Sequence, residues 1–375
     1  MNTTSDAIVV GLGAVGSAAA YHLARRGLRV IGLDRFAPPH PHGSSHGDSR
    51  IIRKAYFEGA RYLPLIERAY VLWRELETAT GQPLLRITGG LHIGPPTSDV
   101  VEGARRTAQI HNLHAEMLTS EDVQARFPMF RLPEGHVGLW EAEAGVLDAE
   151  ACLQTHLAQA CRHGAVVRID EPVLRWQAVG SGVQVKTDRA TYHADRLVLC
   201  AGGWIRDLLP ELGLPLHIER QVNGWFRPRA NAPLFDSARC PVYIWAYAPD
   251  AKFYGFPDLG RGLKVGLHHQ GQRVDHPDAL DRTPTPTDEA AMRAPLRRLL
   301  PDADGRLLRT ATCFYTNTPD QHYLIDVHPD HPQVAFASAC SGHGFKASGV
   351  VGEALADLVT GIAPQVPLDA FRWNG

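Results

Sequence analysis

A glycine pattern near the start of the chain constrains the fold more than any other feature of the sequence. Gly11, Gly13 and Gly16 have the spacing G-x-G-x-x-G, directly after the apolar residues 8–10 and before a second apolar stretch, residues 28–33. The first glycine allows a tight turn, the second lets the backbone approach a bound group, and the third lets a helix pack closely on a strand. Free N–H groups at the start of such a helix favour phosphate. We therefore predict a strand–helix–strand unit that binds the pyrophosphate of a dinucleotide.

An acidic residue after the second apolar stretch refines this prediction. Asp34 lies at the carboxyl end of the predicted strand, where its carboxylate can accept hydrogen bonds from both hydroxyls of an adenosine ribose. An anionic side chain at this position disfavours a ribose 2′-phosphate. The unit is common to FAD and NAD proteins and does not decide between them.

The bulk properties of the chain argue against several classes of partner. Its 375 residues are enough for a large core and indicate two domains, and the formal net charge is −2, without a basic run. No apolar run approaches the roughly 20 residues that span a bilayer, and residues 1–6 are polar and lack a basic leader. The six cysteines include no C-x-x-C pair, as is typical of a reducing compartment. We expect a cytoplasmic protein that binds neither nucleic acid nor membranes and has no metal site.

Hydrophobic periodicity predicts an α/β (α+β) chain in which one domain is assembled from several segments. The aromatic, alternating region 214–271 indicates an antiparallel sheet, and the apolar strand before Ala201-Gly-Gly-Trp204 returns the chain to the nucleotide-binding sheet. We predict a Rossmann-like cofactor domain of residues 1–87, 145–213 and 307–375, with an inserted substrate-binding sheet domain of residues 88–144 and 214–306. Helices are expected at about 62–79, 149–162, 205–209, 287–300 and 350–360, and strands at 84–94, 138–147, 166–169, 173–179, 183–187, 307–315 and 334–338.

Three further stretches carry a more specific signal. They are G-S-S-H-G-D-S-R-I-I-R at 43–53, F-Y-G-F at 253–256 with G-L-K-V-G-L-H at 262–268, and C-F-Y-T-N-T-P-D at 313–320 with S-G-H-G-F-K at 341–346. Together with the glycine pattern, these stretches resemble the monomeric sarcosine oxidase and N-methyltryptophan oxidase family, essentially from end to end.

This resemblance implies a D-amino-acid-oxidase-like fold, a monomer, and FAD bound covalently through a cysteine sulfur to the 8-methyl carbon of the flavin. It implies oxidation of a secondary (N-methyl) amino acid such as sarcosine to an imine, which is hydrolysed to amino acid plus aldehyde, while O2 is reduced to H2O2. Several alternatives stay open: N-methyltryptophan or a cyclic secondary amino acid such as pipecolate or proline as substrate, a dehydrogenase with another electron acceptor, a flavin-binding protein without catalysis, and an NAD dehydrogenase.

The resemblance assigns the FAD-linking thiol to Cys313. From the residues alone, a cysteine among polar and aromatic neighbours at a strand end is a plausible nucleophile, although composition by itself favours an ordinary buried thiol. Cys340 is the competing candidate. We interpret the remaining cysteines as ordinary buried thiols: Cys152, Cys161, Cys200 and Cys240.

Two cations match residues that act beside the flavin in the family. Lys264 matches the oxygen-activating lysine, and a fixed ammonium would stabilise the anions that form during O2 reduction. The alternative is a surface lysine on an edge strand, and the alternation of Leu263 and Val265 permits either reading. Arg50 matches an arginine near the flavin face, although a structural role in its loop is also compatible with the sequence.

The remaining matches form a predicted substrate site. Arg53 and Lys346 match the pair that holds the substrate carboxylate, which two converging cations would orient and neutralise. The alternative for Arg53 is a surface ion pair with Glu58. The resemblance places three further residues around the substrate: Tyr254, His268 and Tyr315. It gives His268 a role in tuning substrate binding and hydride transfer, whereas the residues alone would suggest a general base.

The predicted cofactor site extends over most of the chain. It comprises Gly11, Gly13, Val15, Gly16, Asp34, Arg35, Ser44, Arg50, Val173, Ala201, Cys313, Gly342, Gly344 and Lys346. Three residues depart from the family pattern: Ser45 stands where a histidine is usual, Phe57 replaces a glycine in the gating stretch 56–61, and Ala347 replaces a larger residue. We expect the first to alter the flavin environment. The other two would alter the substrate cavity, whose shape should depend on loops 56–61 and 240–256.

Overall fold

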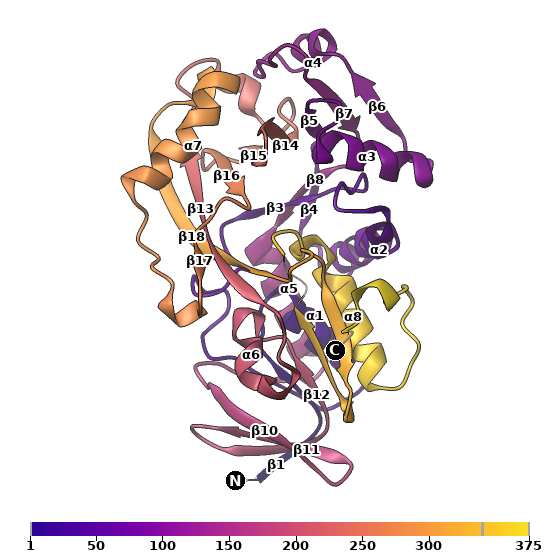
Figure 1. Cartoon of the computed structure of the whole chain (residues 1–375). Coiled ribbons are helices and arrows are strands. Elements are labelled where there is room, and N and C mark those ends of the chain that lie inside the picture. Colours follow the sequence, from indigo (N-terminus) through magenta and orange to yellow (C-terminus); the bar gives the residue numbers. More distant parts are fainter. Residues whose placement is uncertain (1, 339–340, 374–375) are drawn as a thin grey trace.

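Two large sheets, stacked end to end, organise the chain in a computed structural model that describes residues 2–338 and 341–373 (Figure 1). The lower sheet in this view has the order β10-β11-β12-β1-β2-β9, with β20 paired to β12 and β19 paired to β20. Its strands are β1 (Asn2–Val10), β2 (Val30–Leu33), β9 (Val166–Arg168), β10 (Val173–Val179), β11 (Gly182–Thr187), β12 (Thr191–Leu199), β19 (Leu324–His328) and β20 (His331–Ser338).

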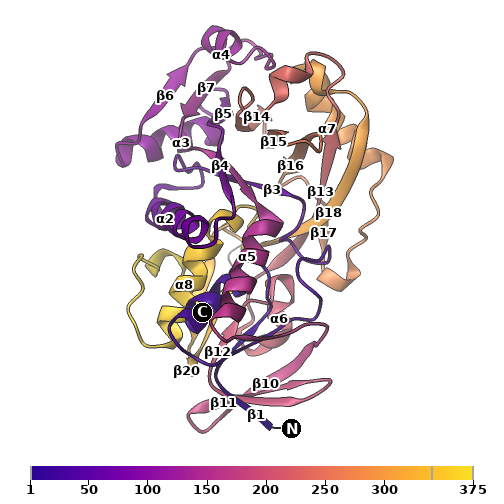
Figure 2. The ribbon, with the colours of Figure 1, turned by 180° about the vertical axis from the view of Figure 1, so that it is seen from behind.

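This lower sheet is the predicted nucleotide-binding sheet. Its central strand β1 pairs in parallel with both β2 and β12, and β12 pairs in parallel with β20. Helix α1 (Ala14–Arg25) packs between α5 (Ala149–Arg162) and α8 (Ser348–Val359), visible from behind in Figure 2. Helix α8 comes so close that a Cβ atom at Gly352 would lie 2.6 Å from the Cβ of Ala18. Helix α2 (Leu63–Thr80) packs on α8, and the short α6 (Ile205–Leu208) follows β12.

The upper sheet has the order β17-β13-β16-β15-β14-β5-β7-β6, with β18 paired to β13. Its strands are β5 (Gly90–Gly94), β6 (Ala115–Leu118), β7 (Val137–Glu141), β13 (His217–Phe226), β14 (Val242–Ala248), β15 (Ala251–Asp258), β16 (Leu263–His268), β17 (Arg273–Val274) and β18 (Leu307–Asn317). The hydrophobic core packed against this sheet contains aromatic side chains such as Phe130, Trp245 and Phe253. The helices of this half are α3 (Asp99–Ile110), α4 (Ser120–Arg126) and α7 (Pro286–Leu299).

A small third sheet lies between these halves. It has the order β3-β8-β4 and consists of β3 (Ser49–Ile52), β4 (Leu85–Ile87) and β8 (Gly145–Asp148). The chain passes repeatedly between the two halves, which confirms the predicted fold class: a Rossmann-like α/β unit combined with a second, largely antiparallel sheet. No helix in the described part of the chain is both long and apolar enough to cross a membrane.

Some local predictions were wrong in a way that the packing explains. The stretch 84–94 is not one strand: it divides between β4 and β5 at Gly89, whose φ is +70° and where a Cβ would collide with the ring of Trp140. Residues 240–256 form most of the β14–β15 hairpin and not a loop. The helices α3 and α4 and the strand β19 were not predicted, because residues 95–137 and 324–328 contain none of the motifs on which the prediction rests.

Candidate active site

A cavity of about 660 Å³ runs from the first turn of the lower sheet to the upper sheet. All predicted cofactor- and substrate-binding residues except Gly16 line it. A Cβ at Gly16 would lie 1.7 Å from the carbonyl oxygen of Gly11, so this glycine permits the close contact of helix and strand that the motif predicts. Residues from the N-terminal, central and C-terminal parts of the chain therefore share one site.

The nucleotide end of the cavity has the geometry of a phosphate cradle. Gly11 has a φ of +83°, and a Cβ there would lie 2.4 Å from the carbonyl oxygen of Cys200. Gly13 is the N-cap residue of helix α1, and it has no side chain that could accept a hydrogen bond from the first N–H groups of the helix. Asp34 accepts hydrogen bonds from the backbone N–H groups of Leu12 (2.6 Å) and Phe36 (2.9 Å), which hold its carboxylate at the end of β2.

These residues fit FAD. The start of α1, where Gly13 provides no side-chain cap, can offer N–H groups beyond that of Ala14 to a pyrophosphate, and Asp34 is fixed where a ribose would lie. Farther along the cavity, the buried hydroxyl of Ser338 has no hydrogen-bond partner within residues 2–338 and 341–373, as expected of a wall that faces a bound polar group. Ser45, which departs from the family pattern, accepts a 3.0 Å hydrogen bond from the N–H of Ala14 at the start of α1.

Lys264 lies on an inner strand and not at an edge. Strand β16 runs between β13 and β15, and Lys264 is 3% exposed. Its Nζ donates to the backbone oxygens of Gly47 (2.6 Å) and Ser49 (2.8 Å). Burial lowers the pKa of Lys264 well below its ordinary value, and neighbouring Arg50 lowers it further. The surface-lysine alternative is therefore wrong, and Lys264 supplies a buried amine to the cavity wall.

Arg50 both lines the cavity and shapes its loop. Its guanidinium donates to the backbone oxygens of Ser44, His46 and Ser49 at 2.7–2.8 Å. It also lies over the ring of Phe345, 5.5 Å from the centroid. The predicted flavin-facing position and the structural alternative are thus both compatible with this geometry.

Cys313 lies on β18 and its buried thiol lines the cavity. Asn223 connects this thiol to the rest of the site: its Nδ2 lies 3.8 Å from Cys313 Sγ, and its Oδ1 accepts a 2.7 Å hydrogen bond from Tyr254. Asn223 was not predicted from the sequence, because an asparagine on a neighbouring strand carries no motif.

The other cysteines are placed differently. Cys152 and Cys240 are buried as predicted, whereas Cys161 is exposed at the end of α5, which corrects its interpretation as a buried thiol. Cys200 is buried but lines the cavity beside the glycine turn. Cys340 lies outside the described residues.

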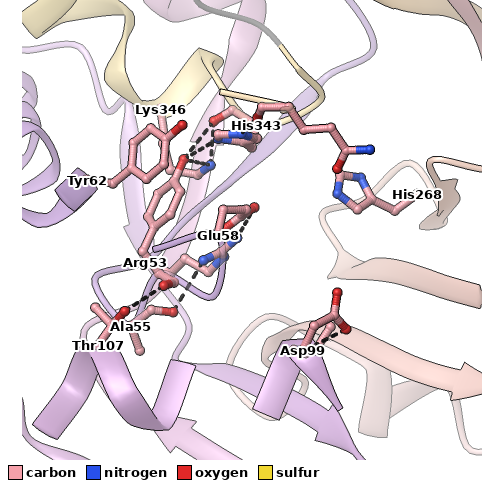
Figure 3. Close-up of polar contacts among 12 residues, drawn as sticks. Arg53, Ala55, Glu58, Tyr62, Asp99, Thr107, His268, His343 and Lys346 are labelled. Atoms are coloured by element: carbon pink, nitrogen blue, oxygen red, sulfur yellow. Dashed lines mark hydrogen bonds and ion pairs between the residues drawn. The ribbon is translucent and has the colours of Figure 1, made fainter. Parts of the chain in front are cut away.

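The predicted carboxylate-binding pair is buried beside an internal carboxylate (Figure 3). Nη2 of Arg53 donates to both oxygens of Glu58 at 2.8 Å, and the guanidinium lies 4.5 Å from the ring centroid of Phe57. Arg53 is only 5% exposed. The alternative ion pair between Arg53 and Glu58 is therefore present, but it is buried and does not lie on the surface.

Lys346 reaches the same region from the opposite side. Its Nζ donates to the backbone oxygen of His343 (2.6 Å) and to Tyr56 Oη (3.2 Å). Tyr56 Oη also lies 2.7 Å from His343 Nδ1 and 2.9 Å from Tyr323 Oη. These contacts of Tyr56 were not predicted from the sequence, since only the fold brings the four residues together.

The charges of this cluster are strongly perturbed. Burial alone would raise the pKa of Glu58, but Arg53, His343 and Lys346 outweigh it and hold the pKa below its usual range. Burial lowers the pKa of Lys346 to about 7, with a further decrease from Arg53 that Glu58 opposes. Burial also lowers the pKa of His343 to about 3. The site thus holds an ionised carboxylate on Arg53 and an amine that titrates near neutral pH.

His268, Tyr254 and Tyr315 lie together on the upper-sheet wall. His268 Nδ1 lies 3.3 Å from Tyr315 Oη, and its ring is packed edge-on to Phe57 at 6.3 Å. Burial lowers the pKa of His268 well below its ordinary value, so the imidazole is neutral. Burial raises the pKa of Tyr254 to about 12. The wall is therefore uncharged and largely aromatic.

Two departures from the family pattern border this region. Phe57 packs against the buried cluster of Val100, Ile244 and Ala246, and its backbone touches α3, where a Cβ at Gly103 would lie 2.3 Å from the Phe57 oxygen. Ala347 is completely buried. The Phe57 side chain also packs against a second buried cluster, formed by Ala55, Ala104 and Leu139, so a bulky group borders the cavity wall at this position.

The pKa of Lys346 leads to a testable pH dependence. The protonated amine attracts a carboxylate, so binding of a carboxylate should weaken as the pH rises above about 7. Butanoate, which replaces the NH of sarcosine by CH2, isolates this effect from ionisation of a substrate amine. We expect its inhibition constant to rise by up to about tenfold per pH unit above the pKa. In a Lys346→Met variant it should be higher and independent of pH; an unchanged pH profile would contradict the assignment.

Comparison with known proteins agrees with this geometry. The model of the family "FAD dependent oxidoreductase" matches residues 6–358. A monomeric sarcosine oxidase of Streptomyces avermitilis is 43% identical over 99% of this chain and 97% of the relative. An N-methyl-L-tryptophan oxidase of Salmonella agona is 36% identical over 98% of both chains.

A solved structure shows the same fold. The open form of NikD, an unusual amino acid oxidase essential for nikkomycin biosynthesis, superposes with a TM-score of 0.87 and 25% identity, over 99% of this chain and 98% of NikD. The similarity extends over the whole chain and includes both sheets. The chain therefore belongs to the FAD-dependent oxidoreductase family, within the group of monomeric sarcosine and N-methyl-L-tryptophan oxidases that its motifs predicted.

Proposed function

We propose that this chain oxidises a secondary (N-methyl) amino acid, with sarcosine as the first candidate, to an imine that water hydrolyses to amino acid plus aldehyde, and reduces O2 to H2O2. The observation that supports this most directly is the carboxylate of Glu58 held by Arg53 inside the cavity, with Lys346 close by. Arg53 binds an internal carboxylate here, so its guanidinium has the position and charge to bind the carboxylate of an amino acid in place of Glu58. N-methyltryptophan and cyclic secondary amino acids remain alternatives.

The residues of the cavity have separate tasks in this proposal. Arg53 and Lys346 orient the substrate carboxylate, and the aromatic wall of Tyr254 and Tyr315 contacts the N-methyl group. His268 is neutral, so it can hydrogen-bond the amine without repelling it and does not have to act as a base. The bound FAD supplies the hydride acceptor. Excluding water from this wall keeps the amine in its neutral, reactive form.

Glu58 should compete with the substrate for Arg53. In Glu58→Gln the neutral amide bonds the guanidinium less strongly, by about 1 kcal/mol, so the KM for sarcosine should fall about fivefold with little change in kcat. The matched control is Glu143→Gln, which removes a surface carboxylate paired with Lys54 and should leave the KM unchanged. An increased KM in Glu58→Gln would mean that Glu58 supports the binding-competent position of Arg53.

Covalent attachment through Cys313 is tested without turnover. When the purified protein is denatured in acid, flavin absorbance should remain with the precipitated chain and should pass into the supernatant for Cys313→Ala. Cys200→Ala is the control, because Cys200 is also buried and lines the cavity. Flavin released from the unmodified protein would show non-covalent binding. Flavin retained by Cys313→Ala would assign the bond to another residue.

The reaction itself is tested with a panel of substrates. Sarcosine, N-methyltryptophan, pipecolate and proline are compared for O2 consumption and peroxide formation, which should be equal in amount. Flavin reduction without O2 consumption would instead identify a dehydrogenase with another acceptor. No flavin colour in protein supplied with FAD would refute the proposed cofactor. We further propose a cytoplasmic monomer, and light scattering after size-exclusion chromatography tests the oligomeric state.

A further inference from the structure

We propose that Glu150 is a positioning residue for the reaction with O2: it holds the turn 47–49, which in turn aims the Lys264 ammonium into the cavity. This inference rests on the proposed oxidase function. Glu150 lies in the first turn of α5 and belongs to none of the motifs that identified the site. Lys264 comes from β16, and the turn leads into β3, whose first residue is Ser49. Three separate parts of the chain therefore meet at this point.

The contacts between Glu150 and the turn are direct. One carboxylate oxygen, Oε1, accepts hydrogen bonds from the backbone N–H of Gly47 (2.7 Å) and of Asp48 (3.2 Å). Hydrogen bonds to a carboxylate are stronger than those between neutral groups. The N–H of Ala149 also donates to the backbone oxygen of Asp48 at 2.8 Å. The start of α5 thus bonds both N–H groups and a C=O group of the turn.

The clamped turn has a conformation that needs support. Gly47 has a φ of +95° and Asp48, which is not a glycine, has a φ of +64°. A residue with a side chain is uncommon in this region, and its strain persists only where the surroundings impose it. On the outer side, the carboxylate of Asp48 pairs with Arg261 at 3.1 Å and with Arg309. Glu150 is the support on the inner side.

This conformation presents two carbonyl groups to Lys264. The backbone oxygens of Gly47 and Ser49 accept from Nζ at 2.6 and 2.8 Å, so two of its N–H groups are directed to the turn. An ammonium has three donors, and the remaining one is available to a group in the cavity. The rings of Phe256 and Trp225 enclose the amine, with centroids 4.8 and 5.4 Å from Nζ. Its direction therefore depends on where the turn holds its carbonyls.

The charge of Glu150 supports the role of Lys264 in addition to the hydrogen bonds that hold the turn. Burial and Arg50 lower the pKa of Lys264, whereas Cys313 and Glu150 oppose that decrease. The Glu150 carboxylate thus favours the protonated amine, the form that stabilises the anions of O2 reduction. The contacts of Glu150 described above do not include Arg53 or Lys346, so substrate binding and flavin reduction should not depend on it.

A double-mutant cycle in the flavin-loaded enzyme tests this inference. The flavin is first reduced anaerobically by sarcosine, which gives the reduction rate, and the reduced enzyme is then mixed with O2. Glu150→Ala should slow the O2 reaction about tenfold, and Glu150→Gln, which keeps an acceptor oxygen but not the charge, about threefold. In a Lys264→Met background, Glu150→Ala should have less than about a twofold further effect, because the two residues act as a unit.

Asp148→Ala is the matched control. Asp148 caps α5 by accepting from the N–H of Ala151 at 2.9 Å, so its loss weakens the same helix start without removing the acceptor for the turn. Its O2 reaction should be unchanged. A crystal structure of the Glu150→Ala holoenzyme provides a readout apart from activity: Nζ of Lys264 should leave the oxygens of Gly47 and Ser49.

Three outcomes would overturn the inference. They are an equal effect of Glu150→Ala in both backgrounds, a slower O2 reaction in Asp148→Ala of the same size, and an unchanged Lys264 in the crystal structure. If Glu150→Ala does not fold, the double-mutant cycle is measured with Glu150→Gln instead. Failure of the proposed function is distinguishable, because the unmodified holoenzyme would then not react with O2 after reduction, whereas the position of Lys264 would still report on Glu150.

Discussion

Replacing Lys264 by methionine should slow the reaction of the reduced enzyme with O2 by about 10²- to 10³-fold, the range found when one preorganised donor is removed from a site of developing negative charge. Flavin reduction by the substrate should change by no more than about threefold. The reason is that Lys264 is buried, held by two backbone oxygens and surrounded by aromatic rings. Methionine has a similar length without the charge, so the cavity is preserved. Anaerobic reduction followed by mixing with O2 measures the two rates separately.

Lys54→Met is the control for this experiment. Lys54 is another of the few lysines of the chain, but its Nζ pairs with Glu143 outside the cavity lining. Its replacement should leave both rates unchanged. If Lys264→Met reacts with O2 at the normal rate, the buried amine has only a structural role. A loss of flavin reduction in the same variant would place Lys264 in substrate oxidation.

Replacing Arg53 by methionine should weaken binding of the amino acid substrate by about 30- to several-thousand-fold, which corresponds to the roughly 2–5 kcal/mol lost when one partner of a buried charge pair is removed. Two effects contribute. The substrate carboxylate loses a bidentate partner, and Glu58 keeps a buried charge with no guanidinium beside it. The dissociation constant is measured from the substrate dependence of anaerobic flavin reduction.

The double variant Arg53→Met/Glu58→Gln separates these two effects. It removes both charges, so any part of the defect that arises from an unpaired Glu58 should be restored, and the remainder belongs to the lost contact with the substrate. Sarcosine binding that is normal in Arg53→Met would refute the carboxylate site. Complete recovery in the double variant would mean that Arg53 serves only to neutralise Glu58.

Local pattern was sufficient for the cofactor half of the molecule. The spacing of Gly11, Gly13 and Gly16, the apolar stretches beside them and Asp34 after the second one predict the order of β1, α1 and β2 and the ends of both strands, although β1 begins at Asn2 and β2 only at Val30. The reason is that each of these residues acts within its own strand–helix–strand unit, through a turn, a helix start or a close contact. Helix α5 was predicted with its bounds for the same reason: its apolar spacing is a property of consecutive residues.

The substrate half depended on contacts between distant segments, and its prediction was less complete. Lys264 illustrates this, since the alternation of β16 is the same for an edge strand and an inner strand, and only the pairing with β13 and β15 buries the amine. The division of residues 84–94 at Gly89 depends on Trp140, about fifty positions away in the sequence.

The same physical difference separates the two kinds of site residue. Residues proposed to bind a cofactor through backbone shape, such as the glycines of the first turn, are visible in the sequence because the required conformation is local. Tyr56, Asn223 and Glu150 became visible only when the fold brought Lys346, Cys313 and Lys264 to them. Their roles depend on hydrogen bonds across 90 to 290 positions of the chain or through an intervening turn, and no periodicity of a single segment encodes such a contact.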